Sequence, residues 1–257
     1  MKYINHAIAE EFNEIDVFLS KKYGVHIKQK EQLVDFTISA LHLVLSVKIW
    51  QKHLTPAFEK NPGIEMYFQE MLSNSIHIVV LGNIDMKIPA IVMLRRTLEQ
   101  ILSYLYYSEH PIELYKKEID DNERILLGFK ELKDYLKSYP FSIKYNIDEC
   151  MMQQFMGRIL NDWTQQYKEL SNYVHGTNSS FFQSAEYVDE FKFVKKDVSF
   201  LTKQVNTVSS IINALLMIFY FESYIAFDEN TEKKILRYSI SNTLQYKNKI
   251  VEILKEV

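Results

Sequence analysis

Apolar side chains recur at intervals of three and four residues along nearly the whole chain, and this spacing constrains the fold more than any other feature. Such spacing places apolar residues on one face of an α-helix, whereas a half-buried strand needs alternation with a period of two, which is rarely sustained here. The 257 residues include only 6 glycines and 5 prolines, few chain breakers for a many-stranded sheet. Because 16 phenylalanines, 17 tyrosines and 2 tryptophans can fill a thick core, we predict an all-α protein.

Cap and turn residues divide this pattern into helices. Gly24 ends the first, the Leu81-Gly82-Asn83 stretch breaks the third, Asp85 offers an N-cap to the fourth, Pro140 separates two halves, and Gly176 follows the long helix of the second half. The predicted helical stretches cover approximately residues 5–22, 31–53, 64–80, 85–107, 112–119, 123–139, 148–174, 198–227 and 232–255. We therefore expect a bundle of about eight helices.

No internal repeat, low-complexity tract or long linker interrupts the chain. The simplest interpretation is one helical domain over residues 1–257, with a C-terminal helix at about 232–255. One segment, residues 186–194, is ambiguous, and a short extended hairpin is an alternative for it.

Charge and cysteine content exclude several classes of protein. The formal net charge is −3, so no global basic surface favours duplex nucleic acid, although a local patch stays open. The single Cys150 excludes a disulfide framework within the chain and a cysteine-rich zinc site. Scattered histidines and the absence of a glycine-rich phosphate loop predict no metal and no cofactor.

No apolar leader is visible near the N-terminus, where acidic residues stand instead. Residues 208–227 are nearly long enough to cross a membrane, but they include Asn213 and Glu222, and a buried core helix gives the same pattern. We therefore expect a cytoplasmic protein without a membrane span.

The first polar feature lies in an otherwise apolar helix. Arg95 falls on the stripe formed by Ile88, Ile91, Leu98 and Leu102, and Glu99 follows it by four residues. An arginine that faces a core must have its donors occupied, because an unpaired buried charge is costly. It is either an internal Arg95–Glu99 pair that fixes packing or an anion-holding group in a polar pocket.

The second polar feature ends the helix predicted at 148–174. Tyr167, Ser171 and His175 follow one another at four-residue steps and share, with Leu170 and Val174, a sector of roughly 140°. His175 stands at the helix end, where carbonyl groups favour a cation, so a capping role accounts for it. The alternative role is general acid–base catalysis, with Ser171 in the same hydrogen-bond network.

These two features together resemble the HEPN superfamily. The matching residues are the L-R-x-x-L-E stretch with Arg95 and Glu99, and the Y-x-x-L-S-x-x-x-H-G stretch from Tyr167 to Gly176. The resemblance spans residues 30–227 in helix order and implies an HEPN-like helical core, often dimeric. Many such proteins are metal-independent ribonucleases of toxin–antitoxin, abortive-infection and CRISPR-linked systems.

By this resemblance His175 is the catalytic histidine, with Arg95 and Ser171 beside it. The expected binding residues are Glu99, Tyr167, Lys168 and Asn172. The implied partners are RNA, a second copy of the chain, or a protein encoded in the same operon.

The sequence departs from the family at one point. The family's R-x(4–6)-H pattern would place an arginine at Lys168, Glu169 or Leu170. A lysine cannot form the planar guanidinium fork, so we expect Arg95 to supply the missing cation from the neighbouring helix. Three functions follow as hypotheses: a ribonuclease of a defence system, a non-catalytic interaction module, or a bundle that binds a small anion near Arg95.

Overall fold

The computed structural model describes residues 5–119, 128–145, 148–182, 187, 194–240, 250 and 252. Across these residues the chain forms α-helices and short 3-10 turns, with no strand in the described ranges. The helices are α1 (His6–Tyr23), α2 (Glu31–Lys60), α3 (Glu65–Asn83), α4 (Lys87–Glu109), α5 (Pro111–Ile119), α6 (Phe129–Lys137), α7 (Phe141–Tyr145), α8 (Glu149–Val174), α9 (Lys195–Phe219), α10 (Phe221–Ile225) and α11 (Glu232–Ser239). The all-α prediction is confirmed.

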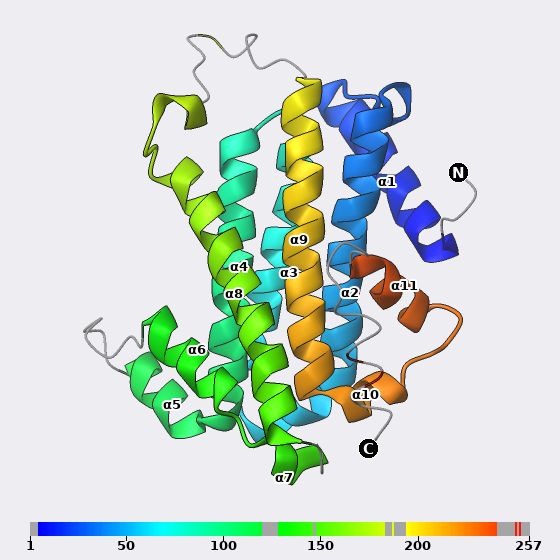
Figure 1. The fold of residues 1–257 in the computed structure, drawn as a ribbon. Coiled ribbons are helices and arrows are strands. Elements are labelled where there is room, and N and C mark those ends of the chain that lie inside the picture. Colours follow the sequence, from blue (N-terminus) through cyan, green and yellow to red (C-terminus); the bar gives the residue numbers. More distant parts are fainter. Residues whose placement is uncertain are drawn as a thin grey trace.

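Five long helices, α2, α3, α4, α8 and α9, lie side by side and form the body of the protein (Figure 1). The short helices α5, α6 and α7 pack at one end, and α1 and α11 lie along α2. Because α9 contacts α2, α4 and α8, it occupies the middle of the bundle.

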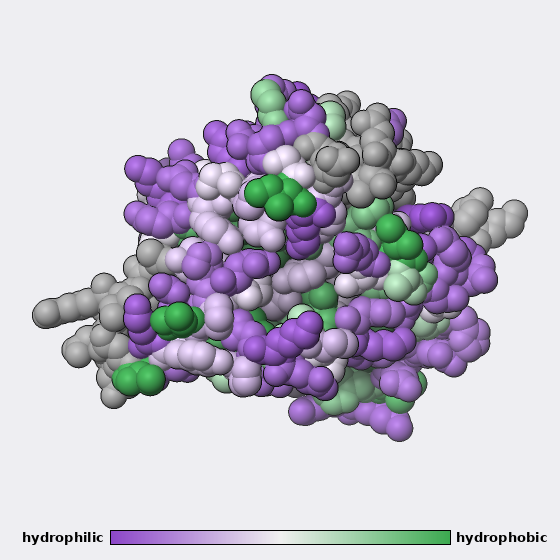
Figure 2. Space-filling view, turned by 90° about the horizontal axis from the view of Figure 1, so that it is seen from below, coloured by the Kyte–Doolittle hydropathy of each residue, from purple (hydrophilic) through white to green (hydrophobic). Residues whose placement is uncertain are grey.

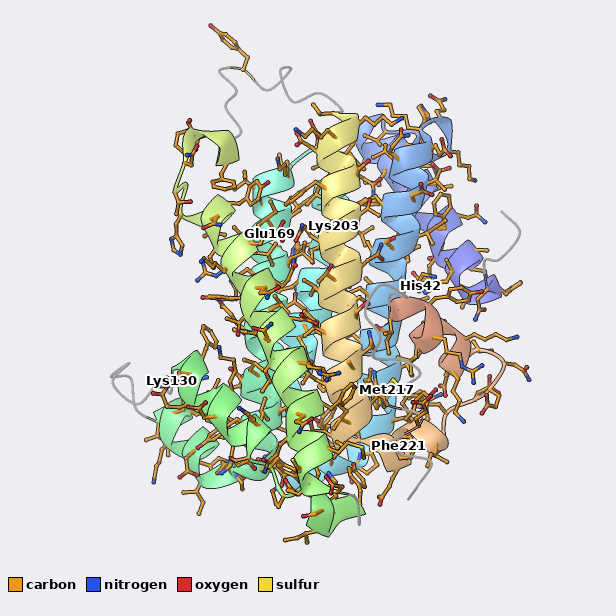
Figure 3. The ribbon with its side chains drawn as sticks, viewed as in Figure 1. His42, Lys130, Glu169, Lys203, Met217 and Phe221 are labelled. Carbon is orange, nitrogen blue, oxygen red and sulfur yellow. The ribbon has the colours of Figure 1, made fainter. Side chains whose placement is uncertain are left out.

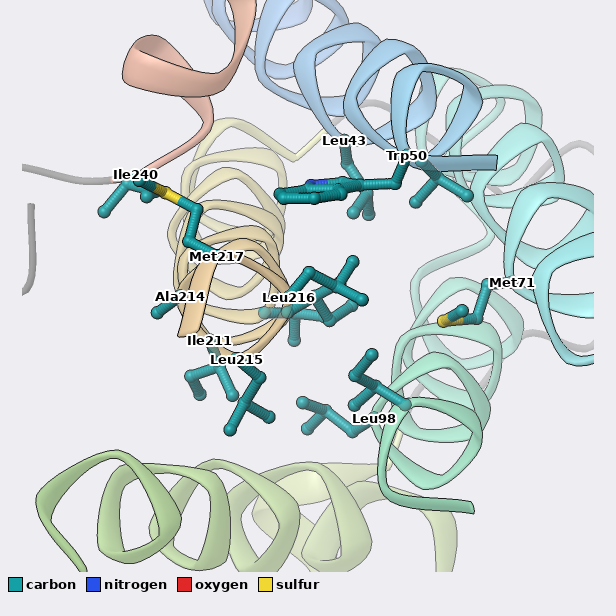
Figure 4. Close-up of a cluster of buried hydrophobic side chains, with 14 of the residues drawn as sticks. Leu43, Trp50, Met71, Leu98, Ile211, Ala214, Leu215, Leu216, Met217 and Ile240 are labelled. Atoms are coloured by element: carbon teal, nitrogen blue, oxygen red, sulfur yellow. The ribbon is translucent and has the colours of Figure 1, made fainter. Parts of the chain in front are cut away.

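The core forms where the apolar stripes of these helices meet. Leu43 and Trp50 of α2 and Leu98 of α4 converge on α9, whose Leu215 and Leu216 lie between them (Figure 4). These five side chains are fully or almost fully buried. Burying large side chains supplies most of the free energy that holds such helices together, since short helices are marginal alone.

The chain has eleven α-helices in its described part, rather than about eight, and several boundaries differ from the prediction. Helix α2 continues through Pro56 to Lys60, and α3 continues through Gly82, which does not break the helix. Asp85 is not the N-cap of α4, because it takes a left-handed φ of 62° and Met86 occupies that position.

The C-terminal third also differs. The predicted 198–227 helix is interrupted at Tyr220, between α9 and α10. The predicted 232–255 helix ends at Ser239, since Ile240 is extended and buried. Beyond it only residues 250 and 252 are described, and both are helical. The hairpin expected at 186–194 lies largely outside the described residues.

One helix in the described part, α2, is long and apolar enough to cross a membrane by length and composition. About two thirds of its most apolar window (67%) is buried inside the protein, and the core helix of a soluble protein passes the same test. Seen from below, the molecule shows single apolar residues scattered among hydrophilic ones (Figure 2). Isolated apolar residues of this kind are ordinary on a water-exposed surface.

Candidate functional site

The long helix α8 carries the second polar feature to the surface. Its start is capped by the Asp148 carboxylate, which accepts a hydrogen bond from the Met151 amide. The helix ends at Val174 with His175 as the C-cap, and Gly176 follows with a left-handed φ of 54°. Glycine adopts this conformation at little cost, so the chain turns away there and leaves the imidazole exposed.

The first polar feature meets the second because α4 packs against α8. Three nitrogens of the Arg95 guanidinium have partners: Nε donates to Glu99 Oε1 at 3.0 Å, Nη2 donates to Tyr167 Oη at 2.8 Å, and Nη1 lies 3.1 Å from His175 Nε2. Two groups eighty residues apart in sequence are therefore in direct contact.

The contact with Arg95 determines which imidazole nitrogen faces the guanidinium. A guanidinium has only donors, so His175 Nε2 must accept the hydrogen bond with its lone pair. A neutral imidazole whose basic nitrogen faces a cation is arranged to accept a proton once the cation is drawn elsewhere.

Aromatic rings pack against Tyr167 and so support its contact with Arg95. The Tyr167 ring lies parallel to that of Trp163, with 5.0 Å between centroids, and Phe129 of α6 lies 5.2 Å away. The Trp163 indole donates to the Leu98 carbonyl at 2.9 Å, which ties α8 to α4. Arg95 Cζ lies 4.9 Å from the Tyr167 centroid, so the ring contributes a cation–π contact.

The other expected site residues are placed less centrally. Ser171 Oγ is buried without a hydrogen-bond partner and does not join the Arg95 network. Lys168 is exposed, and the Asn172 carbonyl accepts from the Thr177 amide at 3.3 Å. The connected group therefore consists of Arg95, Glu99, Tyr167 and His175. Trp163, which supports Tyr167, is a residue of this site that the sequence pattern did not single out.

Comparison with protein-family models, with curated proteins and with solved structures gives no match in any of the three.

A separate cavity of about 550 Å³ lies away from this group, where residues 23–33 meet residues 82–86. Asp85 lines it, and burial together with the charge of Asp197 raises the pKa of its carboxyl to about 6. The described residues include no group of three or more His, Cys, Asp or Glu side chains that could hold a metal ion.

Proposed function

We propose that this chain is an HEPN-like ribonuclease, a toxin-type effector of a bacterial anti-phage or toxin–antitoxin system that acts on RNA in the cytoplasm. The observation that carries the proposal is the 3.1 Å contact between Arg95 and His175 at the exposed end of α8. A phosphate-binding cation and a basic imidazole on one surface are the two groups that metal-independent RNA cleavage needs.

In the proposed reaction a phosphate of the RNA draws the Arg95 guanidinium to its non-bridging oxygens and frees His175 Nε2. The imidazole takes the proton of the neighbouring ribose 2′-hydroxyl, and the 2′-oxygen attacks phosphorus. The bond to the 5′-oxygen breaks, and that oxygen takes a proton from solvent. The products are a 2′,3′-cyclic phosphate and a 5′-hydroxyl.

Arg95 has in this proposal the role of the arginine that Lys168, Glu169 and Leu170 do not supply. Its guanidinium offers the planar fork that a lysine lacks. Glu99 and Tyr167 hold that fork in place, since each accepts a hydrogen bond from it.

Induced expression in bacteria tests the proposal. The wild-type chain should arrest growth and degrade RNA, while His175→Ala and Arg95→Ala should not. Matched controls are His26→Ala and Arg96→Ala, since both residues are exposed and are not bonded to the Arg95 network. Equal growth and RNA integrity in all five strains would reject a nuclease.

A second candidate is a non-catalytic interaction module, in which Arg95 only fastens α4 to α8. The observation in its favour is that Nε, Nη1 and Nη2 of Arg95 all have partners within the protein. This candidate expects a stoichiometric partner to co-purify from the native host, together with a lower melting temperature for Arg95→Ala and no change in RNA.

A further inference from the structure

The geometry points to a track for the phosphate backbone of an RNA strand along the flank of α8 that faces α6, leading to Arg95 and His175. The inference rests on the proposed function, because RNA is its substrate there. It identifies the surface that holds the RNA strand beyond the cleaved bond and the lysines that bind this strand.

The outer flank of α8 carries a stripe without acidic residues. Its members are spaced four and three residues apart, so they share one helical face. They are Gly157, Asn161, Thr164, Lys168, Ser171 and His175. Asn161, Thr164, Lys168 and His175 are exposed, whereas the Ser171 hydroxyl is buried. A solvated helix face usually mixes both charge signs, whereas this one offers only neutral polar and basic groups to a ligand.

The lysines of α6 lie beside this stripe. Lys130, Lys133 and Lys137 follow a spacing of three and four, and Lys130 is visible on α6 in Figure 3. Lys133 Nζ donates to Thr164 Oγ1 at 2.9 Å, and Lys137 Cε lies 3.8 Å from where a side chain on Gly157 would begin. The lysines therefore extend along α8, and a glycine leaves room next to one of them.

The acidic residues of α6 point away from Lys133. By helical periodicity Glu131 lies about 160° and Asp134 about 100° from Lys133, although Asp134 lies only about 40° from Lys130. On α8, Glu169 belongs to the opposite flank, since it accepts from Gln204 of α9 at 3.0 Å. Positive charge is thus concentrated on the α6 side.

A chain of side-chain contacts, which passes through the buried Trp163, connects the α6 lysines to the proposed catalytic pair. Lys133 lies 5.4 Å from the Trp163 ring, Trp163 stacks on Tyr167, and Tyr167 binds Arg95. From Gly157 to His175 the helix rises about 27 Å, enough for several consecutive phosphates. A strand bound here would present one phosphate to Arg95 while Lys133 and Lys137 hold others.

Binding of a fluorescent single-stranded RNA tests this surface. The 2′-hydroxyls should carry methyl groups, so that the strand cannot be cleaved and binding is measured alone. The variant Lys133→Gln/Lys137→Gln should bind about tenfold more weakly at low salt, and its salt dependence should be shallower by about 1.4 in log–log slope. The control Lys203→Gln/Lys234→Gln removes two exposed lysines elsewhere, Lys203 being on α9 (Figure 3).

The outcomes separate the track from the proposed function. Weaker binding only in the α6 variant, with a wild-type melting curve, supports the track even if unmodified RNA is never cut; in that case the nuclease proposal alone fails. Equal binding by both double variants, or no binding by the wild type, overturns the track even if RNA is cleaved.

Discussion

Single residues decide how closely the helices approach, and Gly82 is the clearest case. A Cβ at this position would lie 2.1 Å from Phe36 Cζ, which is buried between α2 and α3. Gly82→Ala should therefore destabilise the protein by about 1–3 kcal/mol, because the ring must move within a packed core. Gly157→Ala is the matched control, since that position is open and alanine favours a helix by up to about 1 kcal/mol. Urea unfolding of both variants should show opposite signs; a stabilised Gly82→Ala would contradict the close packing.

A second prediction concerns the buried Asn213. Its Oδ1 accepts from the Trp50 indole at 3.0 Å, and its Nδ2 donates to Ser46 Oγ at 3.0 Å. Asn213→Leu keeps the number of side-chain heavy atoms but leaves the buried Trp50 indole N–H without its acceptor, so the free energy of unfolding should fall by about 2 kcal/mol or more. Asn161→Leu, on the exposed flank of α8, should change it by less than about 0.5 kcal/mol. If the two variants unfold at the same urea concentration, the buried network has no such role.

At the scale of elements, α11 is fastened to α2 around His42. Ser239 Oγ donates to the His42 carbonyl at 3.0 Å, and the Tyr238 ring lies 5.6 Å from the imidazole. Burial lowers the pKa of His42 to about 4, and its Nδ1 has no hydrogen-bond partner. The folded protein therefore holds this side chain neutral.

The pH dependence follows from that lowered pKa. Between about pH 6.5 and pH 4 the unfolded chain binds a proton at His42 that the folded chain does not, so stability falls as the pH falls. The wild type should lose up to about 3 kcal/mol over this window relative to His42→Gln. Comparing the two proteins cancels the opposite contribution of Asp85, whose raised pKa adds stability as the pH falls. Parallel curves of unfolding free energy against pH would rule out His42 as the cause.

The elements themselves were largely predictable. Helices α1, α4, α5 and α8 begin and end near the predicted positions, because Gly24, Pro111, Asp148 and Gly176 mark local chain geometry. The interruption at Tyr220 has no such mark. Its hydroxyl lies 3.3 Å from Ser108 Oγ on α4, so a tertiary contact made 112 residues away accompanies the break. Gly82 was misjudged for the same reason, since its role is to admit Phe36.

At the scale of the whole molecule, the candidate site depends on an arrangement that the sequence could suggest but not establish. Helical spacing predicted that Arg95 and Glu99 lie one turn apart, and likewise Tyr167 and His175. Their meeting depends on the packing of α4 against α8, which no local pattern encodes. The burial of Ser171 without a partner was equally invisible, because periodicity gives a direction around the helix and not the neighbours found there.

Cleavage of RNA by the purified chain is the decisive test of the proposed ribonuclease activity. A 5′-labelled single-stranded RNA should be cut by the wild type in the presence of a chelator and leave 2′,3′-cyclic phosphate ends. His175→Ala should slow cleavage by about a hundredfold or more, as expected when a general base is lost, while His26→Ala should cut at the wild-type rate. Intact RNA with the wild type, or equal cleavage by His175→Ala, would contradict the account.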